Sequence, residues 1–125
     1  MIYGIGTDIV HVNRMRDNLE KHGNKFARRI LTESEFVEFE TKANKAAFLA
    51  KRFAAKEATA KAMGTGFSQG LSLHHIGIGH DEAGKPVLEF LDVAEKFLHT
   101  NKIKQAHLSL ADEQEYAVAF VTLVL

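Results

Sequence analysis

In the first half of the chain, apolar residues recur every three or four positions, which is the pattern of amphipathic helices. Only the opening segment, residues 2–10, reads instead as a strand. Thr32 and Glu35 have the spacing of a capping box, and Gly23 and Gly64 are typical helix ends. The predicted helical stretches are residues 12–22, 26–31, 32–39 and 45–63.

The second half of the chain is mostly strand-like. Residues 73–79 and 87–91 flank a turn at Gly84-Lys85-Pro86 and predict a hairpin. Asp92 and Glu95 are placed to cap a short helix after the hairpin.

Two further strands are predicted at the end of the chain, at residues 105–111 and 116–125, and the second is nearly all β-branched and apolar, as a central strand is. Because strands and helices do not alternate regularly, we expect an α+β fold. In it, a small antiparallel-rich sheet packs against a long central helix and shorter helices, with residues 1–125 as a single domain.

The composition is that of an ordinary globular protein, with 125 residues, 46% hydrophobic and 26% charged. No apolar run of about 18 residues or more and no signal-like start is present, so we expect neither membrane spanning nor secretion. Cysteine is absent, which suits the cytoplasm and excludes disulfides and thiolate catalysis. Any bound metal must therefore use oxygen or imidazole ligands.

Charge is balanced overall, with 16 Lys and Arg against 16 Asp and Glu, which argues against a nucleic-acid-binding protein. Two segments are nevertheless basic. Residues 11–31 hold six Lys and Arg against two acidic residues, and residues 42–61 hold six against one. These runs are either solvated helix faces or sites for anionic groups. No Walker loop, nucleophile elbow or aromatic-basic ladder occurs.

Two carboxylates stand out as candidates for chemistry. In the first strand, Gly4, Gly6 and Asp8 share one face, which leaves room for a close neighbour beside a carboxylate; the glycines could also serve strand packing alone. In the long helix, Glu57 and Lys61 continue the apolar row of Leu49 and Phe53, so a carboxylate enters a packed face.

One interpretation of Glu57 is a surface ion pair with Lys61. The other is that Asp8 and Glu57 hold a magnesium ion, with Lys61 facing the phosphates of a substrate. Gly64-Thr65-Gly66 then offers main-chain N–H groups to an anion, although it is equally an ordinary helix end.

Histidines give weaker signals. His74 and His75 point to opposite sides of an extended chain and are poor joint metal ligands. His107 and Ser109 share one face of the penultimate predicted strand and form a polar surface there, which could be no more than a solvated sheet face.

Three motifs resemble the holo-acyl-carrier-protein synthases, the short bacterial 4′-phosphopantetheinyl transferases. They are Gly4-Ile-Gly-Thr-Asp-Ile-Val10, Phe53-Ala-Ala-Lys-Glu-Ala58 with Lys61, and Gly64-Thr-Gly66. The likeness extends to Ala27-Arg-Arg-Ile-Leu-Thr32, Phe48-Leu-Ala-Lys-Arg-Phe53, Gly84-Lys-Pro86 and His107-Leu-Ser109.

The resemblance implies transfer of the phosphopantetheine arm of coenzyme A to a serine of apo acyl carrier protein, in fatty acid biosynthesis, with magnesium as cofactor. It makes Asp8 and Glu57 the metal ligands, and Glu57 or a metal-bound water the base. It makes Lys61 the third catalytic residue, which neutralises the charge of the phosphates. Residues implied in coenzyme binding are Arg52, Lys61, Gly64, Thr65, Gly66, Pro86, His107 and Ser109.

The resemblance also implies a homotrimer with sites at the subunit seams and a basic docking helix for the acidic carrier. The docking residues expected from it are Arg14, Met15, Phe26 and Arg28. Two positions depart from the family pattern. His11 replaces a frequent glutamate, which predicts weaker or pH-sensitive metal binding if this position tunes it, and Ala111-Asp112 puts polar contacts beyond Ser109 in doubt.

Two other functions remain open: a non-catalytic module that binds coenzyme A or the carrier, and a magnesium-dependent phosphohydrolase. Retention of Asp8, Glu57 and Lys61 argues against the module. The phosphohydrolase would require a water nucleophile in place of the carrier serine.

Overall fold

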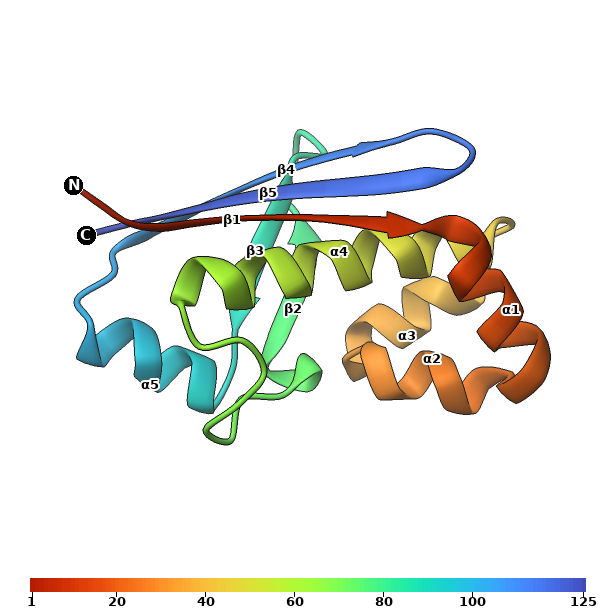
Figure 1. The fold of residues 1–125 in the computed structure, drawn as a ribbon, viewed down its shortest axis with the longest axis horizontal. Coiled ribbons are helices and arrows are strands. Elements are labelled where there is room, and N and C mark those ends of the chain that lie inside the picture. The colour runs from red at the N-terminus through yellow and green to blue at the C-terminus, as the bar shows by residue number, and fades with distance from the viewer.

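A computed structural model describes all residues, 1–125, and has the predicted α+β class (Figure 1). Its elements are β1 (Ile2–His11), α1 (Val12–His22), α2 (Asn24–Ile30), α3 (Glu33–Glu40), α4 (Lys45–Met63), a 3₁₀ turn (Leu73–His75), β2 (Ile76–His80), β3 (Pro86–Phe90), α5 (Val93–Thr100), β4 (Gln105–Asp112) and β5 (Tyr116–Val124).

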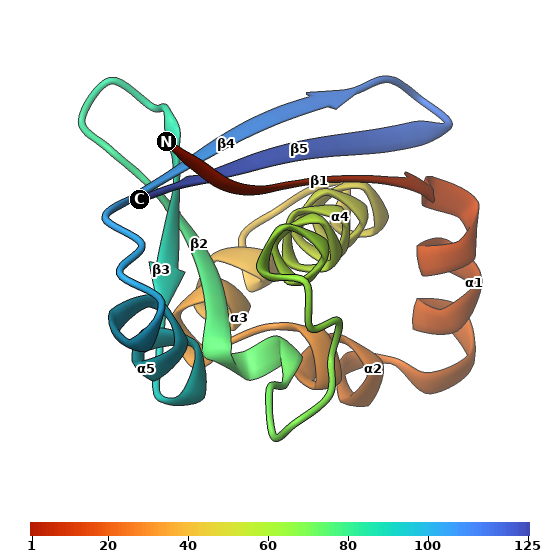
Figure 2. The same cartoon turned by 60° about the vertical axis from the view of Figure 1, so that its left-hand side comes forward.

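Two antiparallel sheets frame the long helix α4, which is seen nearly end-on in Figure 2. One sheet has the strand order β1-β5-β4, and the other is the β2-β3 hairpin. The prediction that the last strand is central is therefore confirmed. Its inward side chains, Ala117, Ala119, Val121 and Leu123, are fully buried against α4.

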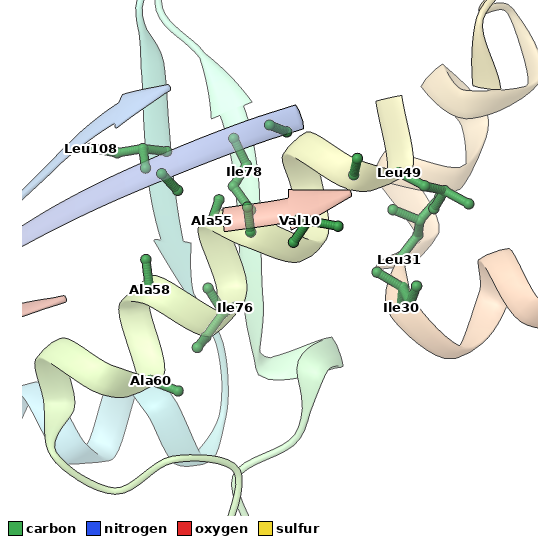
Figure 3. Packing of buried hydrophobic residues seen from close by; sticks show 14 of the residues in the cluster. Val10, Ile30, Leu31, Leu49, Ala55, Ala58, Ala60, Ile76, Ile78 and Leu108 are labelled. Carbon is green, nitrogen blue, oxygen red and sulfur yellow. The ribbon is translucent and has the colours of Figure 1, made fainter. Parts of the chain in front are cut away.

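The hydrophobic core lies around α4 and receives side chains from almost every element (Figure 3). Leu49, Ala55 and Ala58 of α4 are fully buried, as is Ile76 of β2. Small side chains along α4 let the strands approach its backbone closely. The helix is therefore buried nearly all round and has no single apolar stripe.

Gly4 and Gly6 are the positions where β1 crosses α4 most closely. A Cβ atom on Gly6 would lie 2.0 Å from the carbonyl oxygen of Ala58, and one on Gly4 would lie 2.1 Å from that of Ala62. The two glycines therefore serve helix-strand packing, which was one of the two interpretations of the sequence. Their packing brings the next residue on the same face, Asp8, to the surface of α4.

Two local predictions are wrong. Residues 73–75 form a 3₁₀ turn, so the strand of the hairpin begins only at Ile76. Asp92 precedes α5 but its side chain makes no capping hydrogen bond, because its backbone is left-handed (φ 49°) and its carboxylate lies 4.0 Å from His75. The capping box of Thr32 and Glu35, in contrast, is present at α3.

Candidate functional site

Asp8 and Lys61 meet where β1 crosses the last turns of α4. The ammonium Nζ of Lys61 lies 3.0 Å from Asp8 Oδ1 and donates a second hydrogen bond to the carbonyl oxygen of Thr7, also at 3.0 Å. Glu57 is one helical turn before Lys61 on the same face of α4. The structure thus brings together the two carboxylates and the lysine that the sequence singled out.

The carboxyl of Glu57 has a raised pKa. Partial burial is the largest cause, and the negative charge of Asp8 adds to it, whereas Lys61 and Arg14 act in the opposite direction. Two carboxylates that repel each other in a partly buried place favour a shared proton or a bound cation between them.

This shift predicts how the metal-free protein responds to pH. A carboxyl with a raised pKa in the folded state is destabilising when ionised, and this cost disappears as pH falls through the raised pKa. Glu57→Gln should therefore raise the melting temperature at pH 8 by about 2 °C, and the gain should vanish toward pH 4. Thermal unfolding of both proteins in chelator would show this, and an equal gain at every pH would contradict it.

The donor set at this place suits a hard divalent cation. Magnesium commonly takes one or two carboxylates and completes its shell with waters and substrate phosphates, which matches Asp8 and Glu57. No group of three or more His, Asp or Glu side chains in the structure is arranged to hold a metal. A cation here would therefore depend on oxygen atoms from a substrate or from water.

Residues Gly64 to Gly66 form the C-terminal cap of α4. Gly64, with φ 82°, donates its N–H to the carbonyls of Ala60 and Lys61, and Gly66 donates its own to Ala60. The Thr65 hydroxyl bonds to the carbonyl of Gly66 at 2.8 Å. The two glycine N–H groups therefore satisfy the end of α4 in this structure, as the plainer interpretation had it.

Arg52 and Pro86, two of the residues implied in coenzyme binding, line one cavity of about 520 Å³. Arg52 is only 3% exposed, and its Nη2 lies 3.3 Å from Glu38 Oε1. Lys42, Lys51, His80 and Asp112 also line this cavity. Asp112, one of the positions that depart from the family pattern, therefore lines this cavity. Its carboxylate lies 4.0 Å from the ammonium of Lys51.

This cavity and the Asp8-Lys61 pair are on different sides of α4. Arg52 and Lys61 are nine residues apart, which in an ideal helix is half a turn around the axis and about 13 Å along it. His107 and Ser109 are in a third place, exposed on the face of β4 that points away from α4. One chain therefore does not gather all the predicted coenzyme-binding residues.

The predicted docking residues are only partly accessible. Arg14 on α1 is exposed, with its guanidinium carbon 5.4 Å from the centre of the Phe53 ring. Phe26 is half-buried, and Arg28 stacks over Phe36 at 3.8 Å beside another cavity. The prediction that Met15 docks the carrier is wrong. Met15 is 1% exposed and packs in the core beneath α1, so it offers no surface to a partner.

His11 ends β1 and caps the helix that carries Arg14. Its Nδ1 accepts a hydrogen bond from the N–H of Asn13 at 3.2 Å, and its ring meets that of Tyr116 edge-on at 4.8 Å. Since side chains alternate along a strand, His11 and Asp8 lie on opposite faces of β1. In this structure His11 serves the start of α1 and does not touch the carboxylates.

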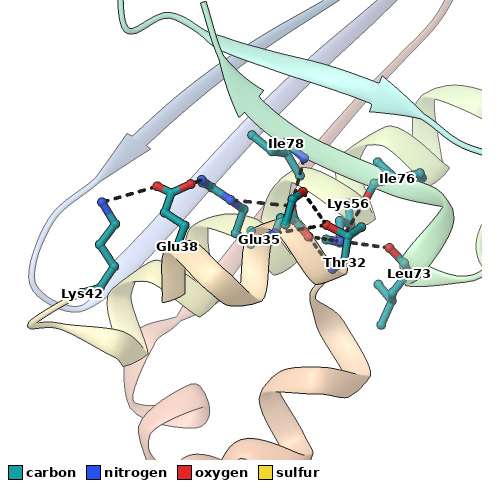
Figure 4. A network of polar contacts seen from close by, with 10 residues as sticks. Thr32, Glu35, Glu38, Lys42, Lys56, Leu73, Ile76 and Ile78 are labelled. Carbon is teal, nitrogen blue, oxygen red and sulfur yellow. Dashed lines mark hydrogen bonds and ion pairs between the residues drawn. The ribbon is translucent and has the colours of Figure 1, made fainter. Parts of the chain in front are cut away.

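A buried ion pair between Glu35 and Lys56 was not predicted (Figure 4). Lys56 is 0% exposed and donates to Glu35 Oε1 at 2.7 Å and to the carbonyls of Leu73 and Ile76 at 2.9 and 2.7 Å. Burial is the main reason that its pKa is lowered, and the charge of Glu35 opposes that effect. The only sequence signals were the capping box and the position of Lys56 inside the Lys-Glu-Ala motif.

Comparison with known proteins agrees with this arrangement. The sequence profile described as the 4′-phosphopantetheinyl transferase superfamily matches residues 4–121. A holo-[acyl-carrier-protein] synthase of Nitrosococcus oceani is 56% identical over 124 residues, which cover 99% of this chain and 80% of the relative.

Solved structures show the same fold. The holo-[acyl-carrier-protein] synthase of Neisseria meningitidis superposes with a TM-score of 0.93 at 47% identity, over 98% of both chains. That of Bacillus anthracis, solved in complex with CoA (3′,5′-ADP), has a TM-score of 0.81 at 38% identity, over 98% of this chain and 96% of the other. The chain therefore belongs to the 4′-phosphopantetheinyl transferase superfamily, among the holo-[acyl-carrier-protein] synthases.

Proposed function

We propose that this protein transfers the 4′-phosphopantetheine arm of coenzyme A to a serine of apo acyl carrier protein, in support of fatty acid biosynthesis. The serine oxygen forms a bond to the phosphorus next to pantetheine, and the P–O bond to the other phosphate breaks. The products are holo acyl carrier protein and adenosine 3′,5′-bisphosphate. The observation that carries the proposal is the meeting of Asp8, Glu57 and Lys61, in a chain of this family.

Asp8 and Glu57 would hold a magnesium ion, whose charge would offset the negative charge of the diphosphate. Lys61 would pair with the same phosphate oxygens, for which it must exchange its present contact with Asp8. Lys61 is about half exposed whereas Asp8 is 17% exposed, so the lysine can turn from the carboxylate to an incoming phosphate without leaving the solvent-exposed surface.

Proton removal from the serine would fall to Glu57 or to a water. The raised pKa of Glu57 makes it a stronger base than an ordinary glutamate and supports the first choice. A water near the two carboxylates remains the alternative.

We further propose a homotrimer with sites at its seams. In one chain, the Arg52 cavity and Lys61 face different sides of α4, so one coenzyme would reach both only if a second chain supplied one of them. The outer face of the β1-β5-β4 sheet supports such an assembly. It exposes large apolar side chains, with Ile5 59%, Ile9 63% and Phe120 45% exposed. His107 and Ser109 lie on that same face.

Arg14 is the docking residue with the best support. It is exposed beside Phe53, and it lies near enough to Glu57 for its positive charge to lower the pKa of that carboxyl. We expect Arg14→Ala to raise the KM for an acidic carrier about tenfold and to flatten the salt dependence of kcat/KM. Steady-state transfer assays at low and high salt would measure both. Arg29→Ala, which removes an exposed charge from α2, is the control, and an unchanged salt dependence for Arg14→Ala would contradict docking there.

The experiment that tests the function is intact-mass spectrometry of an apo acyl carrier protein incubated with this protein, coenzyme A and magnesium. A mass gain of one phosphopantetheine arm that is lost in Asp8→Ala, and lost on chelation, is expected. No gain with a folded protein and several carriers would favour the binding module. Release of phosphate without a mass gain would favour the phosphohydrolase.

The remaining expectations concern the setting of the protein. We propose a single domain over residues 1–125, a cytoplasmic location and no nucleic-acid or membrane partner. The balanced charge supports the absence of a nucleic-acid partner. None of the helices combines the length and the apolar character that a membrane crossing requires.

A further inference from the structure

The cavity beside Arg52 has three permanent cations and two carboxylates among its 12 lining residues. Lys42, Lys51 and Arg52 line it together with His80, and they come from α4, from the connection before it and from the end of β2. Pro86 and Leu110 close the side next to β3 and β4. Three permanent positive charges against the carboxylates of Glu38 and Asp112 leave this cavity of about 520 Å³ with a net positive charge, which favours an anionic group.

Arg52 is the fixed member of this group. Its guanidinium is 3% exposed, stacks over the Phe48 ring at 4.4 Å and is tied to Glu38. Its Nε is buried and has no acceptor within hydrogen-bond distance, with the nearest carboxylate oxygen, that of Glu35, at 3.6 Å. This Nε is paired in charge with the buried carboxylate of Glu35, which does not line the cavity, so it holds Arg52 in place.

The two lysines are held by carboxylates. Lys42 Nζ lies 3.4 Å from Glu38 Oε2, and Lys51 Nζ lies 4.0 Å from Asp112 Oδ2. All four side chains are about one-third to two-fifths exposed, and ion pairs of that exposure contribute little, so an incoming anion can replace the carboxylates. A carboxylate that stays at the cavity then repels the anion.

We infer that Asp112 is a specificity-determining residue that limits how strongly this cavity binds the 3′-phosphate of an adenosine nucleotide, because it neutralises Lys51 and adds a negative charge at the cavity. The inference rests on the proposed function, in which coenzyme A is the donor and carries this 3′-phosphate. Asp112 would thus weaken the discrimination between nucleotides with and without that phosphate. Glu38 differs from it, because Glu38 also orients the buried Arg52.

The test is calorimetric binding of adenosine 3′,5′-bisphosphate and adenosine 5′-monophosphate to the wild type, Asp112→Asn and Glu113→Gln. Glu113 is the neighbouring exposed carboxylate and does not line the cavity. We expect Asp112→Asn to bind the bisphosphate about three- to tenfold more tightly, with less than about a twofold change for the monophosphate, and the gain to shrink at high salt. Glu113→Gln should change neither affinity.

Equal gains for both nucleotides, or no gain, would overturn the role of Asp112. The transfer assay separates this from the proposed function. If the phosphopantetheine arm is transferred to the carrier but Asp112→Asn leaves the ratio of the two nucleotide affinities unchanged, only the role of Asp112 is overturned. A wild type that binds neither nucleotide and transfers nothing would overturn both.

Discussion

Replacement of Glu57 by glutamine is expected to lower the rate of phosphopantetheine transfer by about 10³-fold, with the fold retained. Glutamine keeps the size of the side chain but loses its charge, its basicity and one strong oxygen ligand. All three matter at a place where Asp8 and Lys61 already meet at 3.0 Å. A loss confined to one of these roles would be smaller, of the order of 10².

Single-turnover transfer followed by intact mass would measure the rate, and circular dichroism would verify the fold. Glu95→Gln, an exposed carboxylate on α5, is the matched control and should keep the wild-type rate. Asp8→Asn separates the roles of the pair, because it removes a ligand but not the proposed base. A rate for Glu57→Gln within tenfold of the wild type would rule out this carboxylate as base and as metal ligand.

The largest effect on folding is expected for Lys56→Met. Methionine fills a similar volume but leaves the carboxylate of Glu35 buried without its closest cation, and it leaves the carbonyls of Leu73 and Ile76 without a donor. Breaking a buried ion pair from one side costs about 3–5 kcal/mol of unfolding free energy. Urea denaturation of the wild type and the variant would measure the loss.

The double variant Glu35→Gln/Lys56→Met tests the reason for that loss. Because it also removes the buried negative charge, it should recover a large part of the stability. Lys25→Met, an exposed lysine on α2, should change the unfolding free energy by less than about 0.5 kcal/mol. A double variant no more stable than Lys56→Met would show that packing, not the unpaired charge, causes the loss.

Much of the local structure was predictable because it depends on neighbours in the chain. The periodic apolar residues marked α4 at residues 45–63, and the Thr32-Glu35 spacing marked the start of α3. The start of α5 was predicted for the wrong reason. The backbone of Asp92 is left-handed, and a side-chain cap requires an extended one.

The candidate site was predictable in part. The glycines before Asp8 indicated room for a close neighbour, and Glu57 and Lys61 continued the apolar row of the helix, so the sequence indicated that these three side chains act together. The ion pair of Lys61 with Asp8 was not predicted; the sequence offered Glu57 as its partner. The docking surface was harder to predict from the sequence. Met15 stands beside Arg14 in the sequence, but its side chain points into the core.

The sequence by itself determined the elements, their order, the α+β class and the residues able to do the chemistry, because these depend on spacing along the chain. Only the tertiary structure decided which neighbouring element each side chain of α4 contacts. A helix that is buried nearly all round has no polar face from which its orientation could be predicted. The pairing of Glu35 with Lys56, 21 residues apart, was decided in the same way. Contacts of that kind arise when separate elements pack, and no local pattern encodes them.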